Sequence, residues 1–593
     1  MRDGTSSPAV LRCRPQRSPL FWLCALIVVF FQPTYSQDAQ NPNPASNSLR
    51  GIVINSVTRE PIAHALVATA DNRFAAFTDD QGRFEFQLPK IESDPNRPAD
   101  GQAFYNVSTQ LMARKPGFLD SGISSSPPQS TAGDDITIAL VPESLIVGRV
   151  NLPSSNQSDR MTVQIYKRQV RDGRAFWAPG ATTTTRSSGE FRIANLRAGI
   201  YKIFTSELMD RDPITFDPRG QLYGYPPIYY PAATDFASAS AITLEAGKTF
   251  QVELSPVLQP YYPVRIAVTN LPSQNGVDVS VALQGHKGPG YSLGYNGEGI
   301  EGMLPNGVYT VEATLQQGQQ TASSSVNITV KDSPVTNAFM AVLPNGSIPV
   351  NITDEGSGQR SSALFARGGF TREQKAEVFL QPAEDFDSGG FASLRPPRKP
   401  NDNDYVLENV RPGRYWLKVT PYRGYVASAV AGSVDLLRQP LVVGPGGASL
   451  PIEIVLRDDG AAIDGTVEGM PPVPADRRSP TLTIRSGLVA MAAGPYVYCI
   501  PLPDSPGRFT ASWVSPQGTF QLQQLPPGGY RVLAFDHQQS ELEYQNAQVM
   551  SGYDDKGPIV RLAPGQTEHV RVALISVPSG RKNLISATSS NSR

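Results

Sequence analysis

The chain has 593 residues and a formal net charge of −1, with 52 Lys and Arg residues against 53 Asp and Glu residues. A single hydrophobic core stops growing at roughly 250–300 residues, so this length excludes a one-domain protein. The balanced charge excludes a field that would attract nucleic acid or an anionic membrane surface. The 51 Gly and 53 Pro residues indicate tight turns between short strands in place of long helices.

Residues 1–36 have the features of an export signal. Arg12, Arg14 and Arg17 precede the apolar run PLFWLCALIVVFF, and the tripeptide TYS at 34–36 offers small residues at a cleavage site. The same run could instead stay as a membrane anchor, but its apolar core from Leu20 to Phe31 is shorter than the roughly 20 residues that span a bilayer. We therefore expect a secreted, periplasmic or cell-surface protein with no transmembrane segment after cleavage.

The linker and the cysteines limit how the mature chain is held together. Residues 37–48 are rich in Asn, Pro and Gln and are expected to form a flexible linker. Cys13 and Cys24 leave with the signal, so Cys499 is the only remaining thiol and an intramolecular disulfide is impossible. Cys499 lies in the alternating pattern PYVYCIP, which favours a buried small hydrophobic residue over a nucleophile. Each domain must be stabilised by packing.

One phrase recurs four times, at starts 106 to 115 residues apart. Its four copies are LRAGIYKI from Leu196, LPNGVYTV from Leu304, VRPGRYWL from Val410 and LPPGGYRVLAFD from Leu525. The Gly-containing pair supplies a tight turn, and the Tyr points with an aliphatic residue two positions later to one face of the next strand. We expect the Tyr to be a core residue with its hydroxyl tied to the turn, in preference to a ligand platform.

Other strand patterns recur in a fixed order around this phrase. Each unit opens with an alternating stretch such as LRGIVINS, continues through a Gly-containing hairpin such as TRSSGEFRIANL, and closes with a stretch such as LEAGKTFQVELSP. These patterns predict five β-sandwich units and a disordered tail, at 49–143, 144–258, 259–345, 346–457, 458–578 and 579–593. The period far exceeds the 20–50 residues of solenoid repeats, so each unit should have its own core and follow the last like beads in series.

The first unit carries three spaced patterns, G-x-V, P-x-x-x-A-x-V and T-D-x-x-G-x-F. Their residues here are Gly51, Val53, Pro61, Ala65, Val67, Thr78, Asp79, Gly82 and Phe84. With these residues, the stretch 49–89 resembles the carboxypeptidase regulatory-like domain. Units 144–258 and 458–578 match it mainly through the hairpin and the corner phrase, and the other two match more weakly. The resemblance implies an all-β tandem array of about five transthyretin-like (prealbumin-like) or Ig-like sandwiches, within the group that has a carbohydrate-binding-like fold, as in large secreted bacterial proteins.

No catalytic motif stands out. A zinc peptidase needs an H-x-x-E pair and a distant His, but no such pair is present. The four histidines fall in three different units: His64, His286, His537 and His569. We expect no G-x-S-x-G elbow and no dinucleotide fingerprint on a strand-to-helix turn, and the sequence lacks the phosphate-binding G-x-x-x-x-G-K-[ST] and a paired C-x-x-C. We therefore predict no catalytic residue, no metal site and no cofactor.

One loop of the second unit exceeds what a plain sandwich needs. Four tyrosines cluster there among Pro and Gly: Tyr223, Tyr225, Tyr229 and Tyr230. Aromatic faces stack on sugar rings or on proline-rich peptide, so these residues are candidate ligand-binding residues. The competing interpretation, which we favour, is that they cap a sheet edge or pack against the next unit, where Tyr261 and Tyr262 follow. Trp177 and Trp513 are weaker candidates of the same kind.

These observations favour a non-catalytic multidomain scaffold, adhesive protein or structural spacer of the bacterial cell envelope. The alternative is an array of carbohydrate-binding modules, which rests on the implied fold group and on the four tyrosines. An accessory subunit of a secreted enzyme is a third hypothesis. Polysaccharides and envelope proteins are the candidate partners and nucleic acid is not, while the oligomeric state stays open.

Overall fold

The computed structural model describes residues 48–69, 72–87, 111–120, 136–153, 160–209, 221–270, 276–284, 286–317, 320–356, 375–383, 386, 392–395, 405–447, 449–470, 494–505 and 507–576. Nearly every regular element in these ranges is a β-strand, and their one α-helix, α1 (Ala547–Met550), has four residues. The chain is all-β, as its strand patterns and composition predicted. The predicted signal at 1–36, the tail at 579–593 and most of the linker at 37–48 lie outside the described residues.

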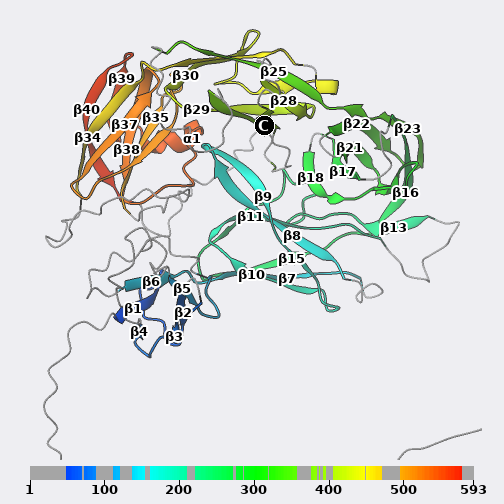
Figure 1. Cartoon of the computed structure of the whole chain (residues 1–593). Helices are drawn as coiled ribbons and strands as arrows, with labels where there is room; N and C mark the ends of the chain where they lie inside the picture. The colour runs from blue at the N-terminus through cyan, green and yellow to red at the C-terminus, as the bar shows by residue number, and fades with distance from the viewer. Residues whose placement is uncertain are drawn as a thin grey trace, which may run out of the picture.

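Residues 48–140 form two three-stranded sheets, ordered β4-β1-β6 and β3-β2-β5 (Figure 1). Their strands are β1 (Ser48–Asn55), β2 (Leu66–Thr69), β3 (Ala75–Phe77), β4 (Arg83–Gln87), β5 (Leu111–Arg114) and β6 (Ile136–Leu140). Alternating apolar positions of both sheets, among them Val53, Val67, Phe84 and Leu140, gather in one buried cluster. The two sheets enclose a core, as in a β-sandwich.

Residues 144–254 repeat this plan with the sheets β10-β7-β15 and β14-β11-β8-β9. Their strands are β7 (Ser144–Val150), β8 (Thr162–Arg171), β9 (Arg174–Thr184), β10 (Glu190–Leu196), β11 (Gly199–Thr205), β14 (Ile242–Leu244) and β15 (Thr249–Leu254). Ile146, Phe191, Ile203 and Leu254 belong to its core. Two further strands, β12 (Leu208–Met209) and β13 (Leu222–Tyr225), leave this sandwich and join the sheet of the next segment.

Residues 259–344 contribute to two sheets, β12-β13-β16-β20-β19 with β23 beside β16, and β18-β17-β21-β22-β24. Their strands are β16 (Gln259–Thr269), β17 (Val277–Leu283), β18 (His286–Tyr291), β19 (Gly294–Tyr295), β20 (Gly299–Pro305), β21 (Gly307–Gln317), β22 (Gln320–Val330), β23 (Val335–Ala341) and β24 (Leu343–Pro344). Because β13 pairs with β16, one sheet crosses the predicted boundary between residues 258 and 259.

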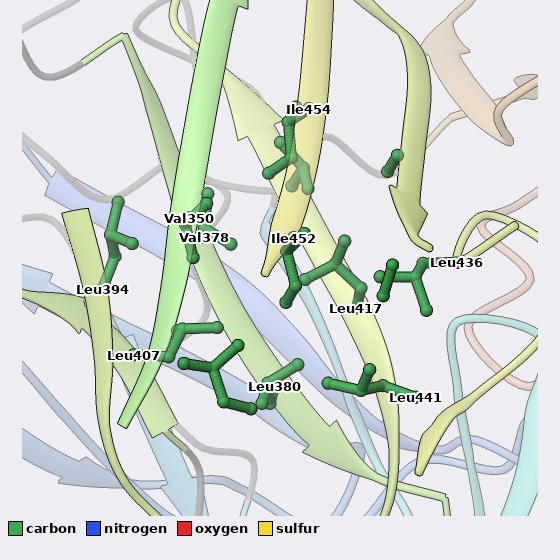
Figure 2. Packing of buried hydrophobic residues seen from close by; sticks show 14 of the residues in the cluster. Val350, Val378, Leu380, Leu394, Leu407, Leu417, Leu436, Leu441, Ile452 and Ile454 are labelled. Carbon is green, nitrogen blue, oxygen red and sulfur yellow. The ribbon is translucent and has the colours of Figure 1, made fainter. Parts of the chain in front are cut away.

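Residues 346–457 form one nine-stranded sheet, ordered β31-β30-β33-β25-β28-β27-β26-β29-β32. Its elements are β25 (Gly346–Asp354), β26 (Ala376–Pro382), β27 (Ala392–Arg395), β28 (Tyr405–Val410), β29 (Gly413–Pro421), β30 (Tyr425–Ala431), β31 (Val434–Asp435), β32 (Leu441–Val443), β33 (Ile452–Arg457) and the 3-10 helix η3 (Pro445–Gly447). Figure 2 shows side chains from strands in both halves of this order, such as Val350, Leu417 and Ile452, meeting in a common core. The sheet therefore folds over onto itself.

Residues 461–575 form a seven-stranded sheet in which β36-β35-β38-β40-β34-β37 are adjacent and β39 pairs with β38. The elements are β34 (Ala461–Glu468), β35 (Tyr496–Pro501), β36 (Thr510–Trp513), β37 (Thr519–Leu525), β38 (Gly528–Phe535), α1, the 3-10 helix η4 (Ser551–Tyr553), β39 (Ile559–Leu562) and β40 (Thr567–Ile575). Cys499 is fully buried in this core, as its strand pattern predicted. The largest buried clusters thus fall one to a segment, and the division into five domains stays a prediction.

A recurring Gly of the opening strands and a recurring Phe of the hairpins pack together. A Gly of the opening strand lies opposite the hairpin Phe in three segments, as the pairs Gly51–Phe84, Gly148–Phe191 and Gly465–Phe520. A Cβ at Gly51 would lie 2.6 Å from the tip of the Phe84 ring and would also collide with a backbone oxygen of β6. Only Gly leaves room for the ring, and the G-x-V and G-x-F patterns therefore act together.

The corner phrase is confirmed as a structural device. In all four copies the Tyr is buried and its hydroxyl donates to the carbonyl oxygen four residues earlier. The pairs are Tyr201 with Arg197 at 2.6 Å, Tyr309 with Pro305 at 2.9 Å, Tyr415 with Arg411 at 3.0 Å and Tyr530 with Pro526 at 2.6 Å. Each bond joins the core strand to the turn before it, the arrangement known as a tyrosine corner.

Candidate functional site

The four candidate tyrosines are divided between surface and interior. Tyr223 is 41% exposed, whereas Tyr225 and Tyr229 are 0% and 2% exposed. Tyr230 is half-buried and meets the edge of Phe250 at a ring-centroid distance of 5.9 Å. Tyr225 belongs to the core of residues 144–254, and its strand β13 pairs with β16. The structure therefore does not bring all four rings onto one accessible surface.

Tyr229 joins two segments. Its ring stacks on Phe204 at 5.2 Å, and its hydroxyl donates to the backbone oxygen of Pro289 in β18. Burial raises the pKa of Tyr229, so the hydroxyl stays a neutral donor. These contacts agree with the interpretation that the tyrosine loop packs against the next unit. Ligand binding by this loop stays a prediction, for which Tyr223 and Tyr230 have exposed surface.

A buried cation anchors the same loop. The Lys202 ammonium donates to the backbone oxygens of Phe236 at 2.6 Å and Ala237 at 3.3 Å, and lies 4.6 Å from the Phe236 ring centroid. In the last segment, Arg531 donates to the backbone oxygens of Tyr553 and Asp554, both at 2.7 Å. Both cations directly follow a corner Tyr, as YK and YR in the sequence, and this shared signal was not used in the sequence analysis.

Glu207 lies at the boundary between the second and third segments. Its Oε1 accepts hydrogen bonds from the backbone N of Ser292 at 2.7 Å and from its hydroxyl at 2.5 Å. Its Oε2 and the hydroxyl of Tyr261 are both buried, and the two groups interact with each other. Burial raises the pKa of Glu207, and the bonds from Ser292 counteract that rise. The boundary therefore holds a carboxyl group whose ionisation is disfavoured by burial.

The histidines remain apart. His64 lies 3.5 Å from Asp80, His537 2.6 Å from Asp536, and His569 contacts Asp464. The side chain of His286 lies outside the described residues. In the described part of the chain, no group of three or more His, Cys, Asp and Glu side chains is placed to hold a metal ion. Burial raises the pKa of the Cys499 thiol, which keeps it protonated and unreactive.

The candidate tryptophans Trp177 and Trp513 differ in exposure, as the candidate tyrosines do. Trp177 is half-buried in an aromatic cluster with Tyr166, Phe204 and Phe236. This cluster also receives Phe386 from the fourth segment, whose ring lies 4.5 Å from that of Phe236. Trp513 is 45% exposed on β36. Trp177 therefore packs between segments, and Trp513 stays available at the surface.

Contacts between the second, third, fourth and fifth segments (residues 144–254, 259–344, 346–457 and 461–575) form a closed cycle. The second segment meets the third where β13 pairs with β16. The third meets the fourth through a bond from the Thr321 backbone N to Asn409 Oδ1 at 3.3 Å, and the fourth meets the fifth through a bond from Arg508 to the Val419 oxygen at 3.2 Å. The fifth segment then contacts the second again. The expectation of beads in series was therefore wrong, because segments far apart in sequence pack together.

The contact that closes the cycle is the β8–β9 hairpin, which Figure 1 shows extending toward α1 and β29. β11 pairs only with residues 163–167 of β8, so beyond that point β8 pairs with β9 alone. The tip residues Asp172 and Gly173 have φ of 50° and 74°, and a type I′ turn requires two such positive values. We call residues 168–177 the arm. The Asp-Gly pair is the signal in the sequence that could have predicted this hairpin.

The arm inserts between the fourth and fifth segments. Arg168 forms a two-pronged ion pair with Glu543, whose side chain is only 10% exposed, and the longer bond measures 2.8 Å. Asp172 lies 2.9 Å from the Lys418 ammonium, and the Arg174 guanidinium lies 3.6 Å above the Trp416 ring. Each charged group of the arm named here thus meets a matching group of another segment.

Alternation along β29 explains why these partners face the arm. Tyr415, Leu417 and Val419 point into the core, so Trp416 and Lys418 point outward. On the other side, the Tyr544 ring touches Gly173 and stacks on Phe509 at 4.1 Å with an interplanar angle of 3°. Trp416, Lys418, Glu543 and Tyr544 together form what we call the receptacle.

Comparisons with known proteins add little. A scan against protein-family models finds no match, and a search of curated proteins finds none either. The chain is similar to the Bacillus anthracis TIE protein, with 10% identity over 70% of this chain and 68% of that one and a TM-score of 0.14. It is also similar to the pilus adhesin SpaC from Lactobacillus rhamnosus GG, with 12% identity, coverage of 50% and 42%, and a TM-score of 0.15.

A third similar structure is the full-length RrgB pilus protein from Streptococcus pneumoniae, with 10% identity, coverage of 74% and 99%, and a TM-score of 0.12. These identities and TM-scores are too low to transfer a function, so the all-β assignment rests on the sheets themselves. The resemblance of residues 49–89 to the carboxypeptidase regulatory-like domain stays an interpretation. Among the described residues, no helix is long and apolar enough to cross a membrane.

Proposed function

We propose that this protein is a secreted, non-catalytic scaffold or interaction protein of the cell surface, whose β-sandwich segments are held in one fixed arrangement. The observation that supports the fixed arrangement most directly is the seat of the arm between β29 and residues 543–545. The Arg168–Glu543 pair joins residues 375 positions apart in the sequence. A spacer of independent beads has no use for such a contact, whereas a scaffold that presents surfaces at set positions requires it.

The tyrosine loop supports the same proposal. Tyr229 and the aromatic cluster around Phe236 are buried between segments, and the Lys202 ammonium binds the backbone oxygen of Phe236. A loop committed to packing in this way fixes the second segment against the third and the fourth. The export signal predicted at 1–36 supports a location outside the cytoplasm.

Small-angle X-ray scattering of the chain without residues 1–36 tests the fixed arrangement. We expect a compact particle whose scattering curve agrees with the arrangement of Figure 1, and the Arg168→Glu variant should give a larger radius of gyration. A charge-matched control is Arg186→Glu, because Arg186 is exposed in the turn between β9 and β10, at the opposite end of β9 from the arm. An expanded, flexible profile for the wild-type chain would contradict the proposal.

Glycan binding is the second candidate, and one observation supports it: Tyr223 keeps 41% of its surface exposed. A glycan array with the purified chain would show saturable binding that Tyr223→Ala removes if this surface is the site. Tyr422→Ala is the matched control, since Tyr422 is 58% exposed on another segment. Binding that survives Tyr223→Ala would show that the surface around Tyr223 is not the glycan site.

A further inference from the structure

The receptacle contacts the second segment at the arm. Trp416, Lys418, Glu543 and Tyr544 contact residues 168–174, all of which lie at or near the tip of the β8–β9 hairpin. The backbone N of Gln545 also donates to the Gly173 oxygen at 3.1 Å. These contacts are made by the hairpin tip, so the pairing of their charges does not depend on which copy of the chain supplies the tip.

The arm depends on the receptacle in turn. Beyond Lys167, β8 loses its pairing with β11, and an isolated two-stranded ribbon is marginally stable in water. On the receptacle side, Glu543 is buried and burial lowers the pKa of Lys418, a change that Asp172 opposes. Removing one member of a buried ion pair is costly because the other is left uncompensated. An empty receptacle therefore favours refilling by another arm.

We propose that the receptacle also binds the arm of a second copy of this chain, so that the protein self-associates by exchanging arms. This proposal rests on the proposed fixed scaffold, because exchange uses the same contact between the arm and the receptacle. The occupant is specified by charge: an arginine must meet Glu543, an aspartate must meet Lys418, and a second arginine must lie over Trp416. Within one molecule the arm is held at high effective concentration, so the closed monomer dominates in dilute solution. Exchange becomes favourable when the closed contact is lost or the chains are concentrated.

Two charge-reversed variants of the full mature chain test the exchange. Arg168→Glu places an acidic arm against its own Glu543, and Glu543→Arg places a basic receptacle against its own Arg168. Each variant alone repels its arm both within one molecule and between identical molecules. In an equimolar mixture, both exchanged contacts pair opposite charges. Light scattering after size exclusion should therefore give the monomer mass for each variant alone and twice that mass for the mixture.

The double variant Arg168→Glu with Glu543→Arg is the control, because it restores an attractive pair within one molecule and should stay monomeric. Near-ultraviolet circular dichroism checks that every variant is folded. Should Glu543→Arg fail to fold, Asp172→Lys and Lys418→Asp repeat the design at a more exposed pair, whose side chains are 44% and 22% exposed. The mixed dimer should dissociate at high salt, which screens its charges.

The outcomes separate the two proposals. A mixture that keeps the monomer mass, while each single variant shows an expanded scattering profile, overturns arm exchange and leaves the fixed scaffold standing. Single variants that keep the wild-type profile show that the arm does not hold the segments together, which overturns the fixed scaffold. A mixture that doubles in mass, with the double variant monomeric, supports arm exchange.

Discussion

Two joints of the molecule hold neighbouring segments by different means. At the first, β13 pairs with β16 and the tyrosine loop buries Tyr225 and Tyr229, so backbone hydrogen bonds and apolar area hold the second segment to the third. At the second, the arm holds the second segment to the fourth and fifth mainly through ion pairs and ring contacts. One joint is therefore part of a core, and we expect the other to open without unfolding either partner.

The largest effect is expected at the core-like joint. Tyr229→Ala removes the stacking on Phe204 and leaves a cavity among buried rings, and truncating a buried aromatic costs about 3–5 kcal/mol. Chemical denaturation should show a lower midpoint for the transition of this part of the chain. Tyr223→Ala, on the same loop but exposed, serves as the control and should change the midpoint little. Equal effects of the two changes would show that this joint is not core-like.

We expect a smaller loss of stability from a substitution in the arm than from Tyr229→Ala. Arg168→Ala leaves Glu543 without its guanidinium, and losing a hydrogen bond to a charged group costs about 1.5–3 kcal/mol, toward the lower end here because Arg168 is 30% exposed. Hydrogen exchange should rise in residues 168–177 while exchange in β13 and β16 stays unchanged. Exchange that rises equally at both joints would mean that the two open together.

A corner tyrosine gives a smaller effect that is local to one core. Tyr530→Phe keeps the buried ring but removes the hydroxyl that donates to Pro526, at a cost of about 1 kcal/mol. The thermal midpoint of the last segment should fall, measured by scanning calorimetry. Tyr496→Phe, a half-buried tyrosine on β35 of the same segment, is the control. A midpoint unaffected by Tyr530→Phe would show that the hydroxyl bond adds no stability.

The smallest effect on stability is expected from ionisation of Glu207, at the joint between the second and third segments. The pKa of Glu207 is raised above its unfolded value, so its contribution to stability is full below an unfolded pKa of about 4.3 and is lost as pH rises through the folded pKa. Glu207→Gln keeps an acceptor for Ser292 without the charge. The variant should gain stability relative to wild type as pH increases from 4 to 7. Glu190→Gln, at an exposed position of β10, is the control, and stability is measured by chemical denaturation at each pH.

Much of the fold follows from local patterns. Alternating residues such as those of YWLKV predict which side chains of β29 enter the core, and the corner phrase predicts the bond from Tyr415 to Arg411. Gly51 and Phe84 are likewise recognisable as a pair because the G-x-V and G-x-F patterns that contain them recur in other segments. These features depend on residues that are close in sequence or repeated along it.

The candidate site shows the limit of such patterns. Tyr223, Tyr225, Tyr229 and Tyr230 form one cluster in the sequence, but strand alternation and the pairing of β13 with β16 send them to different environments. Nothing near Glu543 in the sequence indicates that its partner is Arg168, because that contact depends on how whole segments pack. The sequence by itself determined the strands, the corners and the separate cores, since these arise from short-range geometry. Only the tertiary structure decided which surfaces meet, since packing between segments is set by the shape and charge of complete folded surfaces.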